Sequence, residues 1–195
     1  MRVALRTIAG IVISNVSFPK YLEEEISAND KSCDLILPYL IQSIKQLERS
    51  RSDFIVLPCN TLHLLLPKLR KETNIPILDM VESVCKCIKN NYKKIGILST
   101  NKTRKERLYD NNLNGVEVIY PDYEDQRELS NIIIKIIRGT SDARDNSFLR
   151  DLVNKMIDLG AEKVLLACTD LGNLIKDDRV IDSVDILIDD VRKEF

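Results

Sequence analysis

Two short apolar runs in this chain each end in a cysteine that leads into a helical pattern. The first is Phe54 to Leu57, followed by Pro58 and Cys59, and the second is Val164 to Ala167, followed by Cys168. Short apolar runs of this kind are typical of strands buried on both faces of a parallel sheet. The pattern therefore places each cysteine at the carboxyl end of a strand and at the mouth of a helix. Ligands bind at that place in open α/β sheets.

Buried runs and helical segments alternate along the whole chain, which predicts parallel sheets with right-handed crossovers. The two strand–Cys–helix units also recur in order, each leading to a short strand and an aspartate, Asp79 or Asp182. We therefore predict an α/β fold of two pseudo-symmetric lobes, each a mainly parallel sheet flanked by helices, with the active site in the cleft between them. The expected first lobe is 1–90 plus 177–195 and carries Cys59, and the second is 91–176 and carries Cys168.

The amino-terminal part of the first lobe is expected to begin with a buried strand from Ile8 to Ser14. The polar turn after this strand, Ser14 to Ser17, contains Asn15, which we include among the candidate substrate-binding residues. We interpret the amino terminus as a strand and not as a secretion signal, because no small-residue cleavage site follows it. A cytoplasmic protein with reduced thiols is the corresponding expectation for its five cysteines.

The balance of acidic and basic residues limits the kinds of partner that the protein can bind. The 29 basic and 30 acidic residues give a net charge of −1, which argues against nucleic acid or an anionic membrane as the dominant partner. The sequence has no apolar run long enough to span a membrane. A small molecule is therefore the expected ligand.

A pair of thiols that flank a cleft suits the inversion of a carbon centre without a cofactor. One thiolate removes a proton from one face of a carbon acid, and the opposite thiol delivers a proton to the other face. The attacking thiol needs a lowered pKa, and we expect the adjacent helix N-termini to lower it. Asn60, Thr61 and Thr169 and the backbone N–H groups beside them could hold a substrate carboxylate.

Other interpretations compete with this one. A buried cysteine is often only a small apolar core residue, and we expect that role for Cys33, Cys85 and Cys87. The Cys85-x-Cys87 pair lies on a helix with diverging side chains, so we expect no metal site there. His63, the one histidine, could form a hydrolase-type dyad with Cys59, but a local hydrogen-bonding or packing role is the preferred interpretation.

At these residues the sequence resembles the aspartate/glutamate racemase family of cofactor-independent amino-acid racemases. Cys59 to His63 matches the family's Cys-Asn-Thr-x-His signature, and Ala167 to Asp170 resembles its Gly-Cys-Thr-Glu signature. The loop from Thr100 to Thr103 resembles its threonine-rich substrate loop, and Tyr109 also fits. The resemblance implies that Cys59 and Cys168 are the acid/base residues. It implies that the residues around the substrate's carboxylate and amino group are Asn60, Thr61, Thr100, Thr103 and Thr169.

The sequence departs from the family pattern where the rest of the substrate would bind. Family members usually begin with a strand and a Gly-Gly-x-Gly-Pro loop that lines the pocket, and this sequence has no such motif. Aspartate-type members carry an arginine that reads the distal carboxylate. Here Tyr21 occupies that position beside Lys20, and Arg138 is the candidate for a further basic residue with the same task; its alternative role is a charge at a helix C-terminus.

Three functions follow from the resemblance and its departures. The first is a racemase of amino acids, with aspartate- or glutamate-like substrates expected. The second is a maleate-isomerase- or malonate-decarboxylase-like enzyme on the same fold, and the third is a catalytically silent small-acid-binding protein. The expected partner is a small amino acid or dicarboxylate, and the resemblance makes a homodimer a candidate assembly.

Overall fold

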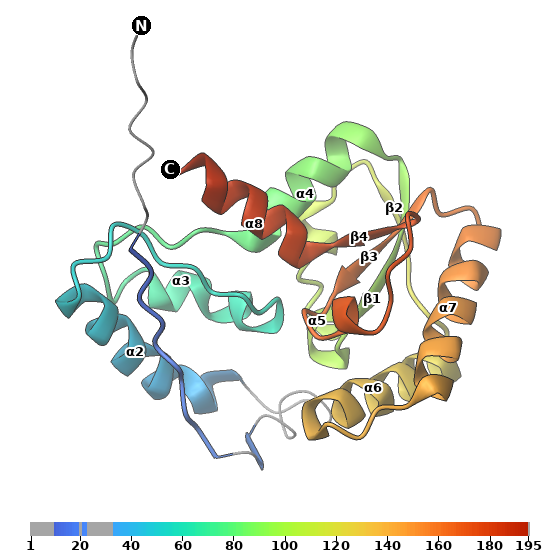
Figure 1. Ribbon diagram of the computed structural model, residues 1–195. Helices are drawn as coiled ribbons and strands as arrows, with labels where there is room; N and C mark the ends of the chain where they lie inside the picture. The colour runs from blue at the N-terminus through green and yellow to red at the C-terminus, as the bar shows by residue number, and fades with distance from the viewer. Residues whose placement is uncertain (1–9, 20, 23–32, 195) are drawn as a thin grey trace, which may run out of the picture.

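A parallel sheet of four strands, in the order β2-β1-β3-β4, forms the centre of the computed structural model. The structure describes residues 10–19, 21–22 and 33–194. The strands are β1 (Lys94–Ser99), β2 (Glu117–Ile119), β3 (Lys163–Ala167) and β4 (Val180–Asp182). Figure 1 shows this sheet with helices around it. The predicted α/β fold with a parallel sheet flanked by helices is confirmed.

Helices cover the sheet on both faces, which explains why the central strands β1 and β3 are buried at every position after their first lysine. On one face Val164 and Leu166 of β3 pack with α6 (Tyr123–Arg138) and α7 (Ala143–Asp158). On the other face Leu165 and Ala167 pack with α4 (Met80–Asn91) and α8 (Ser183–Lys193). Successive side chains of a strand point to opposite faces, so a strand between two helical layers needs an apolar residue at every position.

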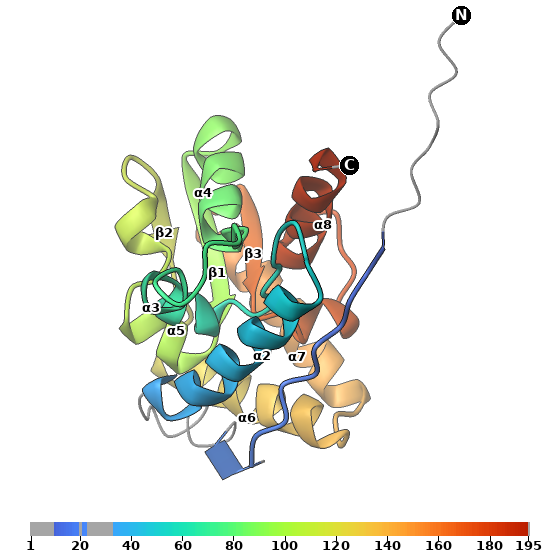
Figure 2. The same ribbon diagram turned by 90° about the vertical axis from the view of Figure 1, so that its left-hand side faces the viewer.

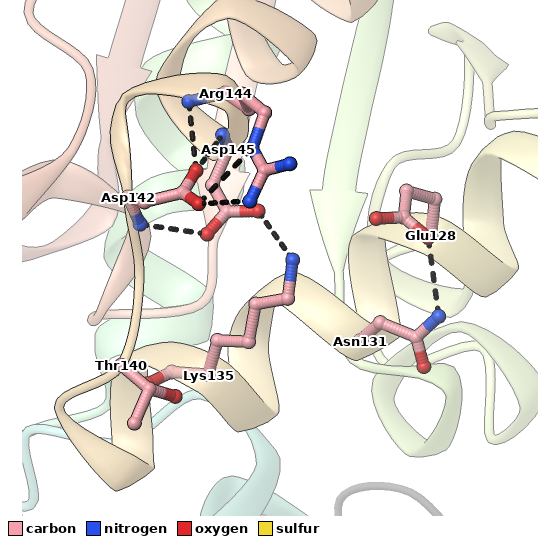
Figure 3. A network of polar contacts seen from close by, with 7 residues as sticks. All are labelled: Glu128, Asn131, Lys135, Thr140, Asp142, Arg144 and Asp145. Atoms are coloured by element: carbon pink, nitrogen blue, oxygen red, sulfur yellow. Dashed lines mark hydrogen bonds and ion pairs between the residues drawn. The ribbon is translucent and has the colours of Figure 1, made fainter.

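A network of polar contacts fixes the joint between α6 and α7 (Figure 3). Gly139 ends α6 in the left-handed conformation, with φ of 69°. Asp142 and Asp145 then form a capping box at the start of α7. The Lys135 ammonium lies 2.7 Å from the Asp145 carboxylate, which is almost fully buried. Because a buried carboxylate needs such partners, this network holds the end of α6 in one position against α7.

The first lobe has its own apolar core, built from helices. It contains η1 (Cys33–Ile36), α2 (Leu37–Arg49), η2 (Thr61–Leu65) and α3 (Leu66–Leu69). The pattern around Pro67 predicts a kink or two short pieces, and the structure has two pieces, η2 and α3. The Cys59 segment pairs with the next extended segment through one isolated parallel bridge, Ile55↔Ile77.

The expected buried strand from Ile8 to Ser14 is wrong for its described part, residues 10–14. These residues form no strand, and Ile11 and Ile13 are 81% and 86% exposed. Figure 2 shows the segment running past α2, where Ser14 bonds to Gln46 and Ser43. A strand requires a hydrogen-bonded neighbour, and none of the described residues pairs with the backbone of residues 11–13.

The carboxyl-terminal segment extends the sheet of the second lobe. The sequence pattern predicts residues 177–195 as part of the first lobe. In the structure β4 instead pairs with β3 through Val164↔Val180 and the two positions after it. α8 follows and packs with α4 over the same sheet. α4 and α8 thus cover the sheet of the second lobe together.

The described part of the chain also contains the short helices α5 (Asn101–Lys105), η3 (Asp110–Asn112) and η4 (Leu171–Asn173). The sequence pattern predicts one helix from Arg104 to Asn112. In the structure this region is divided between the end of α5 and η3, and Arg107 takes a φ of 54° between them. No helix in the described part of the chain has both the length and the apolar character needed to cross a membrane. Within residues 10–19, 21–22 and 33–194, no group of three or more metal-ligand side chains gathers.

Candidate active site

Cys59 lies between the Ile55 bridge and the first turn of η2. Its backbone N–H bonds to the carbonyl of Leu57 at 2.8 Å, so the chain turns sharply before the cysteine. Asn60 then occupies the N-cap position of η2. Cys59 is a free, half-buried thiol. The predicted helix start after this residue is confirmed, but the buried strand predicted from Phe54 to Leu57 is reduced to one bridge at Ile55, with the other three residues half-buried.

Cys168 directly follows β3 and is buried, with 6% of its surface exposed. Its Sγ lies 3.7 Å from Oδ2 of Asp170, in a geometry in which the thiol donates to the carboxylate. Asp170 is the N-cap residue of η4. The sequence pattern gave Asp170 only as part of the second signature, without a role. The structure makes it the carboxylate in contact with this thiol.

Both thiols have a raised pKa, contrary to the expected lowering. Burial raises the pKa of Cys59 to about 11, although the N–H groups of Leu62 and Thr61 oppose this effect. Burial also raises the pKa of Cys168, and the negative charge of Asp170 raises it further. Desolvation of the thiolate therefore outweighs the effect of the helix N-terminus on the pKa of both thiols.

The two cysteines also influence each other electrostatically. A charge on Cys59 raises the pKa of Cys168, and Asp170 raises the pKa of both thiols. Their titrations are therefore linked, and one thiol loses its proton more readily when the other keeps its own. A mechanism that uses one thiolate and one thiol requires such linked titrations.

Three threonine hydroxyls form a closed triangle beside the cysteines. Thr61 Oγ1 lies 3.0 Å from both Thr100 Oγ1 and Thr103 Oγ1. Thr100 Oγ1 and Thr103 Oγ1 are 3.1 Å apart, and the Thr103 N–H donates to Thr100 Oγ1. All three side chains are buried. Thr61 comes from the first lobe and the other two from the second, so the triangle joins the lobes at the predicted substrate-binding residues.

Asn60 is held by a second polar chain. Its Nδ2 donates to Ser183 Oγ at 3.0 Å, and Ser183 Oγ donates to the carbonyl of Leu166 at 2.9 Å. The hydroxyl of Tyr109 donates to Asn60 Oδ1. The side-chain amide of Asn60 therefore bonds to protein on both its oxygen and its nitrogen, which suits the positioning of the Cys59 turn.

Removing the Tyr109 hydroxyl tests this series of hydrogen bonds. Tyr109→Phe is expected to lower the free energy of unfolding by about 1–3 kcal/mol, because it leaves the buried Asn60 oxygen without a donor. Urea titration followed by circular dichroism measures the change. Tyr123 is 78% exposed, so Tyr123→Phe serves as the matched control and is expected to change stability little. Equal stability for the two variants would contradict the proposed positioning of Asn60.

His63 bonds to the backbone through both ring nitrogens. The N–H of Met80 donates to His63 Nε2 at 3.1 Å, so Nε2 carries the lone pair. Nδ1 therefore carries the proton and donates to the carbonyl of Cys59 at 2.9 Å. Burial lowers the pKa of His63, which keeps the ring neutral. His63 links the Cys59 turn to the start of α4 and has no free nitrogen for a Cys–His dyad.

The remaining predicted site residues have different surroundings. Thr169 is half-buried next to Cys168. Asn15 is exposed on the irregular segment beside α2, and Arg138 is exposed in the last turn of α6. Lys20 lies outside the described residues. The threonine triangle consists of its own three hydroxyls, and neither Asn15 nor Arg138 belongs to it.

The sequence pattern did not identify one buried cation near the site. Lys102 lies between Thr100 and Thr103 in α5, is 8% exposed, and its ammonium is 2.9 Å from the Glu106 carboxylate. Its charge lowers the pKa of Cys33 against the larger effect of burial. A lysine in a polar loop is usually exposed, so its burial was not readable from the sequence.

The sequence of this chain is similar to a family model and to proteins of known activity. A model described as Asp/Glu/Hydantoin racemase matches residues 2–191. The broad-specificity amino-acid racemase RacX of Bacillus subtilis (strain 168) is 31% identical over 138 residues, which are 70% of this chain. The match covers 60% of the length of RacX, so the chain spans less than two thirds of this relative.

Solved structures show the same fold. An aspartate racemase homologue from Pyrococcus horikoshii OT3 matches with a TM-score of 0.67 and 29% identity, over 80% of this chain and 72% of its own. The aspartate racemase of Picrophilus torridus matches with a TM-score of 0.68 and 23% identity, over 82% of this chain and 68% of its own. The second similarity concerns the fold alone.

Proposed function

Because this chain belongs to the Asp/Glu/hydantoin racemase family, we propose that it racemises amino acids with Cys59 and Cys168 as the two acid/base groups. One observation supports the proposal most. Cys168 follows β3 and Cys59 follows the segment bridged at Ile55, and a charge on Cys59 raises the pKa of Cys168. A buried hydroxyl triangle beside them joins the lobes. Aspartate- or glutamate-like amino acids are the proposed substrates.

The proposed reaction moves one proton in and one proton out at Cα. A thiolate on one side takes the Cα proton, and the bonding electron pair passes into the substrate carboxylate. The thiol on the opposite side then gives its proton to the other face of Cα. The configuration is inverted, the first cysteine ends protonated, and the second ends as a thiolate. Exchange of the cysteine protons with water restores the starting state, and the reverse assignment of the two thiols serves the other enantiomer.

The threonine triangle is the proposed site for the substrate carboxylate. Each of the hydroxyls at Thr61, Thr100 and Thr103 has one proton, and the triangle holds these three protons among its members. A carboxylate that enters the site accepts one or more of them, because a hydrogen bond to an anion is stronger than one between hydroxyls. The same bonds stabilise the charge that moves from Cα into the carboxylate during proton removal.

Asp170 is proposed to prepare Cys168 for the direction in which Cys168 removes the proton. The carboxylate lies 3.7 Å from the thiol and accepts from it. Transfer of that proton would leave a thiolate beside a neutral acid, which avoids two adjacent negative charges. The negative charge is then on Cys168, and because charges on the two thiols repel each other, Cys59 stays protonated as the donor.

The raised pKa of the thiols predicts how activity depends on pH. Below a pKa of about 11 for Cys59, only a small fraction of the free enzyme carries the required thiolate. We therefore expect kcat/KM for racemisation to rise by about tenfold per pH unit between about pH 7 and 10. Polarimetry or chiral chromatography over this range measures the slope. A plateau that begins near pH 7 would contradict thiols of raised pKa as the reacting groups.

Protein stability must be followed in parallel with this pH profile. A group whose folded pKa is raised contributes stability below its unfolded pKa and loses it as pH rises toward the folded value. For Cys59 this window runs from the ordinary thiol value of 9.0 to about 11. Circular dichroism over the same pH range therefore separates the kinetic rise from the onset of alkaline unfolding.

A further inference from the structure

The segment from Ser99 to Asp110 carries the second-lobe side of the hydroxyl triangle. Thr100 and Thr103 bond to the first lobe through the triangle, and Tyr109 bonds to it through Asn60. The two helices of the segment are short, with five residues in α5 and three in η3. Helices of this length are not stable by themselves. The position of the segment therefore depends on its contacts with the rest of the second lobe.

Gln126 of α6 holds the start of this segment. Its Nε2 donates to the carbonyl of Ser99 at 3.1 Å, and its side chain is buried. Ser99 is the last residue of β1, whereas β2 pairs with β1 only as far as Gly96. The amide of Gln126 thus supplies a donor where the pairing with β2 has already ended. The next residue, Thr100, caps α5 by accepting from the N–H of Thr103, so a shift at Ser99 also moves both threonines.

The guanidinium of Arg104 determines which way the Gln126 amide points. Nη1 of Arg104 donates to Gln126 Oε1 at 3.3 Å and to the carbonyl of Pro121 at 3.0 Å. Because the amide oxygen accepts from Arg104, the amide nitrogen is the group that faces the carbonyl of Ser99. The guanidinium also lies 5.0 Å from the centre of the Tyr120 ring, which is a cation–π contact. Arg104 is thus fixed by residues of the connection between β2 and α6.

The end of the segment is fastened to the same connection. The hydroxyl of Tyr120 donates to Asp110 Oδ2 at 2.6 Å. Burial raises the pKa of Tyr120, and the hydrogen bond to Asp110 raises it further, so the hydroxyl keeps its proton and acts as a donor. Asp110 directly follows Tyr109, which donates to Asn60. Residues 120–126 therefore hold both ends of the segment that meets the first lobe.

We propose that Gln126 is a positioning residue for the carboxylate site, which rests on the proposed role of the threonine hydroxyls in racemisation. Its bond to the Ser99 carbonyl holds Thr100 and Thr103 where their hydroxyls can meet a substrate carboxylate, and Arg104 orients the amide for this bond. Gln126 acts through the backbone and not on the substrate itself. Substrate binding should therefore depend on the amide group of Gln126, and the titration of the two thiols should not.

The substitution Gln126→Glu tests the donor without changing the size of the side chain. The new carboxylate keeps an acceptor for Arg104, whose charge favours the ionised form, but it presents an oxygen in place of the donor to Ser99. KM for racemisation is expected to rise by about tenfold, the effect of one buried hydrogen-bonding group left without a partner. The slope of the pH profile should stay unchanged. Gln42 is exposed on α2, so Gln42→Glu is the matched control and should keep the KM of the unmodified chain.

Variants of Arg104 test whether it acts through Gln126. Arg104→Met removes the donor that orients the amide and should also raise KM, whereas Arg104→Lys keeps a donor for the amide oxygen and should recover part of the loss. When Gln126→Leu is already present, Arg104→Met should raise KM by a smaller factor than it does alone, because the amide that Arg104 orients is gone. Fully additive effects on KM would contradict this order of action.

Amide hydrogen exchange, followed by NMR, separates positioning from a general loss of stability and does not depend on turnover. In Gln126→Glu the N–H of Thr103, which donates to Thr100 Oγ1, is expected to exchange about tenfold faster through local opening, while the amides within α7 keep their rates. Equal acceleration at both places, or an unchanged KM in an active chain, would overturn the proposal. Local acceleration in a chain that racemises no amino acid would support the positioning of the threonines and count against the proposed function alone.

Discussion

Replacing either Cys59 or Cys168 by serine is expected to lower kcat/KM for racemisation by about 10²–10⁴-fold, the usual contribution of a positioned acid or base. Serine keeps the size and the hydrogen-bonding ability of the side chain but is far less acidic than a thiol. Cys87 is half-buried in α4 and belongs to neither signature, so Cys87→Ser is the matched control and should keep full activity.

Isotope incorporation makes this test more specific. A panel of L-amino acids, including aspartate, glutamate and neutral residues, is incubated in D2O and followed by NMR and chiral chromatography. Because the two proposed bases face opposite sides of Cα, the product enantiomer should carry deuterium while the recovered substrate still carries hydrogen. Full activity in both serine variants would exclude the two-thiol mechanism. An inactive wild-type chain that is nevertheless stabilised by amino acids would favour a small-acid-binding protein.

Replacing His63 by alanine is expected to lower the free energy of unfolding by about 2–4 kcal/mol. The change creates a cavity in the core of the first lobe and leaves the buried N–H of Met80 without its acceptor. It also frees the Cys59 turn from α4, so kcat/KM should fall as well. Thermal and urea unfolding measure the first effect, and steady-state kinetics measure the second.

Two conservative variants of His63 separate positioning from catalysis. His63→Gln can retain an acceptor for Met80, and His63→Asn can retain a donor for the Cys59 carbonyl, so each should recover part of the stability. Neither should change the shape of the pH profile, because the neutral ring takes no part in proton transfer. Loss in both variants of a limb below pH 6.5, the side to which burial moves the pKa of His63, would indicate instead that His63 is a base.

The second-lobe sheet and the positions of the two cysteines could be predicted because they depend on local patterns. A run such as Val164 to Ala167 is apolar at every position because helices cover both its faces. The position of the thiol at the end of this strand can therefore be predicted from the sequence alone. The split of the helix at Pro67 is similarly local, since proline removes a backbone donor.

The features that the sequence did not reveal depend on distant partners. Ser183 contacts Asn60 across 123 positions, and no spacing rule connects them. The pKa of Cys59 was expected to fall because a helix start is visible in sequence, whereas burial, which raises it, is not. Residues 10–14 are apolar like a strand, but pairing needs a neighbour that the pattern of one segment cannot show. The burial of Lys102 also depends on partners that the pattern of one segment cannot show.

The threonine triangle has a consequence for how substrates are selected. Thr100 Oγ1 donates to Thr103 Oγ1, so the ring closes only when Thr103 donates to Thr61 and Thr61 donates to Thr100. A carboxylate bound as proposed above would accept one or more of these three protons. A neutral amide in the same place would also present N–H groups, which need acceptors and cannot use these protons. We therefore expect the proposed site to favour an acid over its amide.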